Sequence, residues 1–140
     1  MKTSKAGLDL IKRWEGLRLT AYTCAAGVWT IGWGHTGTVG GRRVRRGMRI
    51  TRATSEKLLV ADVKRFEKAV DALGRKWTQG QFDALVSFAF NCGEKNLHTL
   101  CKGRNPAQIA DALLLYRKAG GKVNAGLVAR RKAERKLFLR

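Results

Sequence analysis

The strongest helical pattern lies in the middle of the chain, at residues 78–93, TQGQFDALVSFAFNCG. Thr78 and Gln81 have the spacing of a capping box, and the residues that follow are apolar on almost every side of a helix. A helix that is apolar all round is usually the buried centre of its domain. This pattern therefore predicts a central helix that the other helices pack around.

Amphipathic patterns predict helices on both sides of this segment. Near the N-terminus, Leu8, Ile11 and Glu15 are spaced three and then four residues apart, as on one face of a helix. A long helix is expected to start at Thr51 or Thr54, with apolar residues in steps of three and four, and to stop at Gly74.

Two further helices are expected in the C-terminal third. Asn105 before Pro106 marks one start, an apolar stripe runs from Ile109 to Tyr116, and Gly120 with Gly121 is expected to end this helix. Asn124 can cap the last helix.

Residues 23–41 form the only segment with a convincing β pattern. Thr, Tyr, Trp and Val residues are punctuated there by glycines, which suits short strands joined by tight turns. We therefore expect an α+β fold that is mostly α-helical, with a small antiparallel sheet after the first helix. A length of 140 residues suits a single domain, residues 1–140, without a separate linker.

The charge balance narrows the class of partner. Lys and Arg number 29 against 10 Asp and Glu, a formal net charge of +19, which indicates a polyanionic partner. Nucleic acid, an anionic membrane surface and a cell-wall polymer all fit, and many of these charges could also form only a solvated face.

The cysteines and histidines do not suggest a metal or another cofactor. Three cysteines without a C-x-x-C pair predict neither a disulfide framework nor a zinc ribbon, and His35 and His98 are the only histidines. Free thiols fit a reducing cytosol. The N-terminal segment lacks the continuous apolar core of an export signal, and the uncharged run 19–41 is too rich in Gly and Thr to span a membrane.

Glu15 is the candidate for acid–base chemistry. It lies on the apolar stripe of the first helix, just before the glycine- and aromatic-rich segment, where a partly desolvated carboxylic acid can donate a proton to a leaving group. The alternative is that Glu15 is simply the last exposed residue of its helix before Gly16.

A spaced motif carries a family resemblance. Glu15, eight residues, Cys24, five residues and Thr30, in TIGWGHT, resemble the motif of phage-type lysozymes, the endolysins of glycoside hydrolase family 24. The similarity continues through residues 47–51, 81–93 and 119–134, and so covers nearly the whole chain. It implies a lysozyme-like fold of two lobes with a helical C-terminal lobe. It also implies a muramidase that hydrolyses the β-1,4 bond between N-acetylmuramic acid and N-acetylglucosamine in peptidoglycan and lyses the host cell.

The resemblance assigns catalytic roles to Glu15, Cys24 and Thr30. The family usually has Asp where this chain has Cys24, and that Asp helps to hold or activate the attacking water. Three roles for Cys24 stay open: a thiolate stabilised by basic surroundings, a neutral group that orients water with Thr30, or a bystander. The first two are favoured because Thr30 is retained; apart from the motif, an unpaired cysteine is most often a small buried hydrophobe.

The resemblance also implies supporting residues. Phe90 and Asn91 match positions at the substrate-binding wall of the cleft, although Phe90 could equally be plain core. His35 is expected to be structural, with Asp62 as its partner, and Arg131 could pair with Glu134 instead of substrate.

Two basic clusters, residues 42–52 and residues 130–140, are expected to hold the protein on peptidoglycan, lipopolysaccharide or another anionic envelope polymer. Two rivals are a nucleic-acid-binding module, for which no specific motif is present, and a cationic protein that disrupts membranes. By resemblance we expect a monomer that waits in the host cytoplasm, depends on a holin for release, and then acts on the wall in the periplasm.

Overall fold

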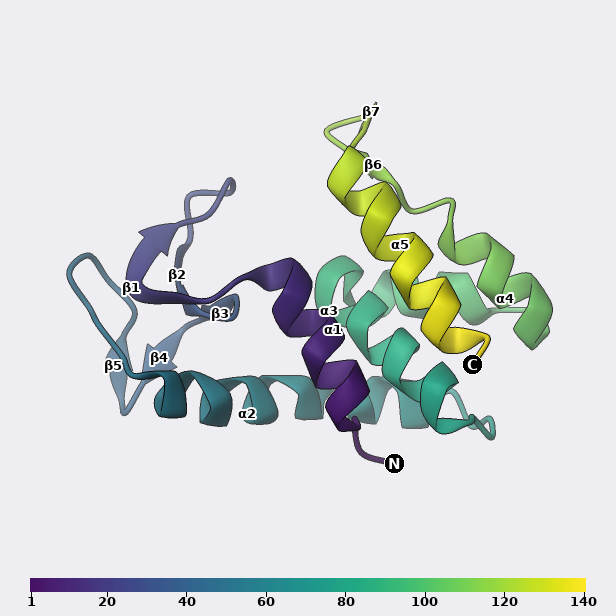
Figure 1. The fold of residues 1–140 in the computed structure, drawn as a ribbon, viewed down its shortest axis with the longest axis horizontal. Coiled ribbons are helices and arrows are strands. Elements are labelled where there is room, and N and C mark those ends of the chain that lie inside the picture. Colours follow the sequence, from purple (N-terminus) through teal and green to yellow (C-terminus); the bar gives the residue numbers. More distant parts are fainter. The chain divides into compact units, whose positions relative to one another are not determined.

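Five helices and two β regions make up the computed structural model, which describes residues 1–140 (Figure 1). The elements are α1 (Lys5–Glu15), β1 (Arg18–Thr23), β2 (Trp29–Gly32), β3 (His35–Thr36), β4 (Thr38–Val39), β5 (Arg42–Arg43), α2 (Arg52–Asp71), α3 (Gln79–Cys101), α4 (Pro106–Leu113), β6 (Lys118–Ala119), β7 (Lys122–Val123) and α5 (Ala125–Phe138). They fall into two compact units, residues 11–64, here the sheet unit, and residues 1–10 with 65–140, here the helical unit. The single-domain assignment stays a prediction.

The sheet unit contains a three-stranded antiparallel sheet in the order β1-β2-β3, and a separate hairpin of β4 and β5. Tyr22 pairs with Thr30 across β1 and β2, and Ile31 pairs with His35 across β2 and β3. The apolar core of this unit consists of Ile11, Ile31, Trp33, Val44, Leu59 and Val63, all at most 4% exposed. The expected sheet after the first helix is confirmed.

The start of α2 is decided by a side-chain cap. The Thr51 hydroxyl accepts a hydrogen bond from the backbone N–H of Thr54 at 3.1 Å, so Thr51 is the capping residue of the two that the sequence allowed. Ser55, fully buried on the first turn, donates from its hydroxyl to the carbonyl of Thr51 at 3.0 Å.

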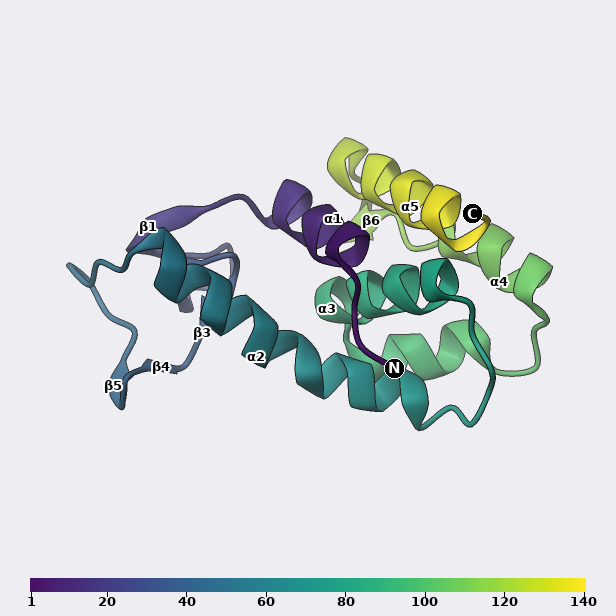
Figure 2. The same ribbon diagram turned by 60° about the horizontal axis from the view of Figure 1, so that its bottom comes forward.

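The helical unit is built around α3, as the sequence predicts. Its residues 82–89 are all buried, and both α4 and α5 pack against it (Figure 2). Thr78 and Gln81 form the expected capping box, and Asn105 and Asn124 cap α4 and α5. Gly93, with φ of +87°, interrupts the helical path where the apolar pattern ends.

A buried ionic cluster joins α5 to α3. Glu134 is fully buried, and one carboxylate oxygen accepts hydrogen bonds from the Ser87 hydroxyl at 2.7 Å and from Arg131 at 3.1 Å. Arg130 also contacts this oxygen, at 3.3 Å, and donates to the Ser87 carbonyl. Burial raises the pKa of Glu134, and the two guanidinium groups oppose that rise. Arg130 and Arg131 are therefore structural cations, as the helical spacing allowed.

The expected extent of the α4 helix is wrong. The helix ends at Leu113, and residues 118–123 form a second β-hairpin, although the sequence suggested only one β region. Gly120 and Gly121 have φ of +57° and +78°, which is the geometry of a two-residue hairpin turn. Tyr116, which the spacing places on the stripe of this helix, lies beyond its end and packs edge-on against Phe88, with 4.9 Å between the ring centroids.

Candidate functional site

Glu15 is the last residue of α1 and is partly buried. One turn earlier, Ile11 is fully buried in the core of the sheet unit and so anchors the end of the helix. Gly16 ends the helix with φ of +70°, and its N–H donates to the carbonyl of Lys12 at 3.0 Å. Glu15 is thus held at a helix end within this unit.

The Glu15 carboxylate lies directly against Gly34, in the turn between β2 and β3. A β-carbon at position 34 would lie 2.6 Å from Oε1 of Glu15, which is closer than van der Waals contact permits. Gly34 also has φ of +72°, which favours glycine. The missing side chain therefore gives the carboxylate its place beside the sheet.

Trp33 fixes this turn from the neighbouring position. Its side chain is 4% exposed, with Lys12 Nζ 4.7 Å from a ring centroid and the Arg52 guanidinium 5.6 Å away. Lys12 also forms an ion pair with Glu56 of α2 at 2.7 Å. Lys12 is one turn before Glu15, and Trp33 is next to Gly34. The contact between Lys12 and Trp33 therefore links the helix that carries Glu15 to the turn that carries Gly34.

Cys24 and Thr30 meet at the β1–β2 hairpin. Thr30 is directly opposite Tyr22, and Cys24 follows the end of β1, two residues after Tyr22. The backbone N–H of Cys24 donates to the Val28 carbonyl at 3.0 Å, and the buried Thr30 hydroxyl donates to the same carbonyl at 2.9 Å. The hairpin thus brings together the two residues that the motif separates by five positions.

The hairpin favours the thiolate form of Cys24. Hydrogen bonding from the backbone N–H of Val28, and then of Ala26, lowers the pKa of the Cys24 thiol, and desolvation opposes this effect. The other two thiols behave differently, since burial raises the pKa of Cys92 and raises that of Cys101 to about 11. Cys24 is therefore the cysteine most disposed to act as a base or nucleophile.

Tyr22 is a site residue that the sequence analysis did not identify. Its pKa is raised first by burial and then by the negative charges of Glu15 and Cys24, while Arg18, 4.4 Å from the ring centroid, acts in the opposite direction. The phenol thus keeps its proton and stands within electrostatic reach of both groups. Its position two residues before Cys24 was the signal that could have identified it.

His35 joins β3 to α2. Its Nδ1 lies 2.8 Å from Oδ2 of Asp62, and its Nε2 lies 2.8 Å from the carbonyl of Thr38. Burial raises the pKa of the Asp62 carboxyl, and the hydrogen bond and charge of His35 oppose that rise. The expected pairing of His35 with Asp62 is confirmed, and a structural role for His35 stays a prediction.

The two expected substrate-binding residues lie on α3, in the helical unit. Phe90 is half-buried and packs against the Phe66 ring at 5.5 Å, as a core residue also would. Asn91 is exposed, and its side-chain oxygen accepts a hydrogen bond from Arg131 at 2.9 Å. This bond orients the amide and leaves its nitrogen to donate elsewhere.

No group of three or more His, Cys, Asp or Glu side chains is arranged to hold a metal ion. None of the helices combines the length with the apolar character that a membrane crossing requires.

The model of the family described as phage lysozyme matches residues 12–134. The chain belongs to the phage lysozyme family. It is 42% identical to the endolysin of Salmonella phage P22 over 145 residues, covering 99% of both chains. It is 43% identical to the endolysin of Bacillus phage B103 over 147 residues, but spans only 54% of that relative.

Solved structures agree with this assignment. The endolysin of Escherichia coli O157:H7 phage FAHEc1 matches with a TM-score of 0.88 and 38% identity, over 99% of this chain and 94% of that one. A mutant of P22 lysozyme matches with a TM-score of 0.86 and 41% identity, over 100% and 99%. The expected lysozyme-like α+β fold is confirmed, and so is the expected class of enzyme, a lysozyme-type glycoside hydrolase that acts on peptidoglycan in host lysis.

We predict that Gly34→Ala impairs hydrolysis of peptidoglycan because the new methyl group displaces the Glu15 carboxylate. A misplacement of about 1 Å can cost on the order of 10²-fold in kcat. The matched control is Gly74→Ala, since Gly74 has φ of +69° and no atom near its missing β-carbon. Both variants should lose about 1–2 kcal/mol of unfolding free energy, but only Gly34→Ala should lose activity per folded molecule. Equal activities would show that the close approach is irrelevant to hydrolysis.

We predict that iodoacetamide alkylates Cys24 at a lower pH than the other cysteines, because the thiolate is the reacting form. Mass spectrometry of digested samples across a pH series would give the three profiles, with Cys101 last, in line with its pKa of about 11. The control is the urea-unfolded chain, in which the three profiles should coincide. A Cys24 profile unchanged by folding would contradict the prediction.

Proposed function

We propose that this protein is a muramidase that hydrolyses the β-1,4 bond between N-acetylmuramic acid and N-acetylglucosamine, with Glu15, Cys24 and Thr30 as its catalytic residues. The observation that carries the proposal is the geometry of the sheet unit, which holds the Glu15 carboxylate against Gly34 and brings Cys24 and Thr30 together at the Val28 carbonyl. A carboxyl group and a thiol provide the two groups that glycoside hydrolysis requires.

Glu15 is the proposed general acid. It donates its proton to the glycosidic oxygen as the bond between that oxygen and C1 of the muramic acid breaks, and positive charge develops on the sugar ring. Its contact with Gly34 supports this role, because a donor must be held in one position to protonate a leaving group.

Cys24 and Thr30 are proposed to act on the attacking water. The Thr30 hydroxyl donates a hydrogen bond to the Val28 carbonyl, so its oxygen is left to accept a hydrogen bond from water. The Cys24 thiolate can take the second proton of that water as its oxygen bonds to C1, and its negative charge stabilises the oxocarbenium ion. The lowered pKa of Cys24 supports the thiolate among the three roles that the sequence left open.

A related structure supports the choice of bond. The structure described as the muramidase domain of SpmX from Asticaccaulis excentricus matches with a TM-score of 0.85 and 38% identity, over 99% of this chain and 98% of that one. Muramidases release N-acetylmuramic acid at the reducing end, and this product distinguishes them from other enzymes that cleave peptidoglycan.

Phe90 and Asn91 are proposed to bind the sugar chain. An aromatic face can stack on a pyranose ring, and the Asn91 amide nitrogen can donate to an acetamido oxygen. The bond from Arg131 supports this role of Asn91, because it fixes the amide orientation.

The β4–β5 region is proposed to hold the protein on lipopolysaccharide or another anionic envelope polymer. Arg42, Arg45, Arg46 and Arg49 surround a hollow of about 450 Å³ together with Val39, Gly47, Met48 and Ile50. Guanidinium groups suit phosphate and carboxylate oxygens. The second basic cluster is smaller than the sequence suggested, because Arg130 and Arg131 are buried with Glu134.

The remaining steps of the lytic role rest on resemblance to endolysins. We propose a monomer that remains in the host cytoplasm until a holin opens the membrane. Expression in the host with and without a co-expressed holin tests this order, and lysis without the holin would contradict it.

We predict that wild-type protein clears purified peptidoglycan and releases muramic acid reducing ends, identified after borohydride reduction. Glu15→Gln and Cys24→Ala should each lower kcat by about 10²–10⁴-fold, the usual range for acid–base groups. Cys24→Asp, which restores an anionic oxygen base, should recover much of the loss. Asn91→Ala should chiefly raise KM.

The matched control for these variants is Cys101→Ala, which removes a buried thiol in the helical unit. Release of glucosamine reducing ends would show that the enzyme cleaves the other β-1,4 bond of the polymer instead of the proposed one. Full activity of Cys24→Ala would make Cys24 a bystander, and full activity of Glu15→Gln would overturn the mechanism.

We predict that salt weakens binding to intact envelopes more strongly in the wild type than in Arg45→Ala/Arg46→Ala, because exposed charges are screened over about 10 Å at 0.1 M salt. Sedimentation with isolated envelopes at low and high salt measures this difference. Identical salt dependence in the two proteins would exclude this region as the contact.

A further inference from the structure

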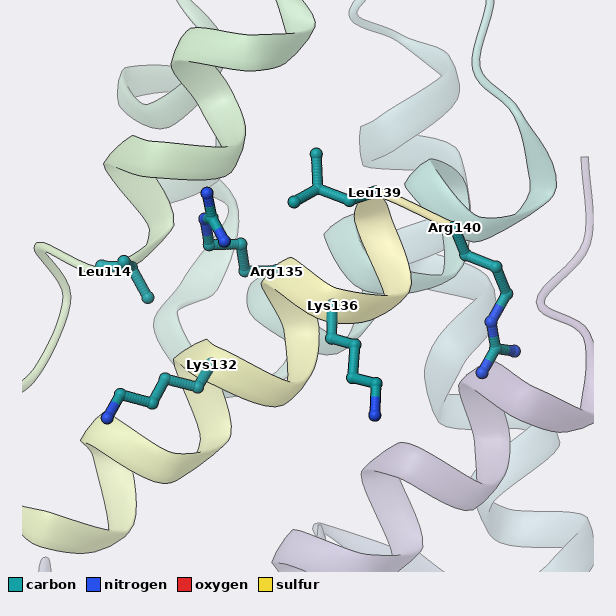
Figure 3. A pocket seen from close by; sticks show the side chains of 6 residues that line it. All are labelled: Leu114, Lys132, Arg135, Lys136, Leu139 and Arg140. Atoms are coloured by element: carbon teal, nitrogen blue, oxygen red, sulfur yellow. The ribbon is translucent and has the colours of Figure 1, made fainter.

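A groove outside the proposed catalytic site runs along the outer side of α5. It has a volume of about 570 Å³, within the usual range of ligand pockets, and belongs entirely to the helical unit. Its lining residues are Leu114, Lys132, Arg135, Lys136, Leu139 and Arg140 (Figure 3). No step of the proposed hydrolysis uses them.

The groove has a net positive charge. Arg135 forms an ion pair with Asp111 at 3.0 Å, whereas Lys132, Lys136 and Arg140 have no carboxylate partner. Cations in the last turn of a helix also complement its dipole, which could explain Arg135 and Lys136 alone. It does not explain Lys132, which precedes the last turn, nor the apolar part of the groove.

The apolar part of the groove consists of two leucines. Leu114 is half-buried, and Leu139, just after α5, is 55% exposed. Figure 3 shows Arg135 between Leu114 and Leu139, with Lys132 and Lys136 extending from the helix. Apolar surface among cations matches a ligand that is both anionic and apolar.

The opposite side of α5 keeps this groove in shape. Glu134, Leu137 and Phe138 are buried in the core of the helical unit, so the helix cannot turn its apolar residues inward. A ligand would therefore meet a preformed surface, and binding would require little reordering.

We propose that this groove binds anionic phospholipid at a membrane surface, with the cations on the headgroup phosphates and the leucines against the glycerol and upper acyl region. The arginine-rich hollow beside β5 is a useful contrast, since its apolar neighbours Val39, Met48 and Ile50 are half-buried. That hollow suits a soluble polyanion, whereas the α5 groove also offers exposed leucine to lipid. This binding is independent of the proposed hydrolysis.

The test is sedimentation of the full chain with vesicles of equimolar phosphatidylglycerol and phosphatidylcholine, and with vesicles of phosphatidylcholine alone. Binding is expected only to the anionic vesicles. Each cation near an anionic surface is worth about a fivefold change in affinity, so Lys132→Ala/Lys136→Ala should weaken binding on the order of 25-fold. Leu139→Ser, which leaves the charge unchanged, should weaken it several-fold.

The matched control is Lys95→Ala/Lys102→Ala, which removes the same charge from exposed lysines of the same unit that do not line the groove and should weaken vesicle binding far less than the groove variant. Equal losses in the two double variants, or no loss in Leu139→Ser, would overturn the proposal in favour of unspecific charge attraction. Displacement by inorganic phosphate at the same phosphate concentration would also overturn it, because the groove would then be an anion site without lipid selectivity. Unchanged thermal unfolding of each variant shows that the exposed substitutions leave the fold intact.

Discussion

The approach of the Glu15 carboxylate to Gly34 is the constraint on which the site in the sheet unit depends. It requires a glycine at a positive φ, a buried tryptophan beside it, and a helix that ends at the same place. Ile11 supplies the helix anchor, and Lys12 links that helix to both Trp33 and Glu56. The carboxylate is therefore positioned by packing and by cations, and not by a flexible loop.

Charge has two separate uses in this molecule. Glu134, Arg130, Arg131 and Ser87 form a buried and hydrogen-bonded cluster that ties α5 to α3. Removing one partner of such a cluster leaves an uncompensated charge in the core, so its members are structurally coupled. The arginines from Arg42 to Arg49 are exposed and surround no carboxylate, which leaves them available to an anionic polymer. Position in the sequence does not distinguish these uses, because Arg131 and Lys132 are neighbours with opposite burial.

Much of the fold follows from local chemistry. The caps at Thr78, Asn105 and Asn124 are confirmed because each forms within three residues of chain. The apolar α3 segment is confirmed as the centre of the helical unit. The expected end of α4 is wrong. The apolar stripe in the sequence continues to Tyr116, and the sequence does not distinguish a ring that packs from a helix from one that packs from a loop. Two adjacent glycines can stop a helix or turn a hairpin, and only the strand partners decide between these outcomes.

The sequence by itself determined the family, through the spacing of Glu15, Cys24 and Thr30, and the type of every long helix, through periodicity and caps. Tertiary structure decided the properties that depend on neighbours distant in sequence. These are the contact of Gly34 with Glu15, the pairing of His35 with Asp62, and the place of Tyr22 beside two reactive groups. It also decided the lowered pKa of Cys24, because this shift arises from backbone N–H groups that a folded hairpin directs at the sulfur. A residue's type is local, but its desolvation and its hydrogen-bond partners exist only once the chain has closed around it.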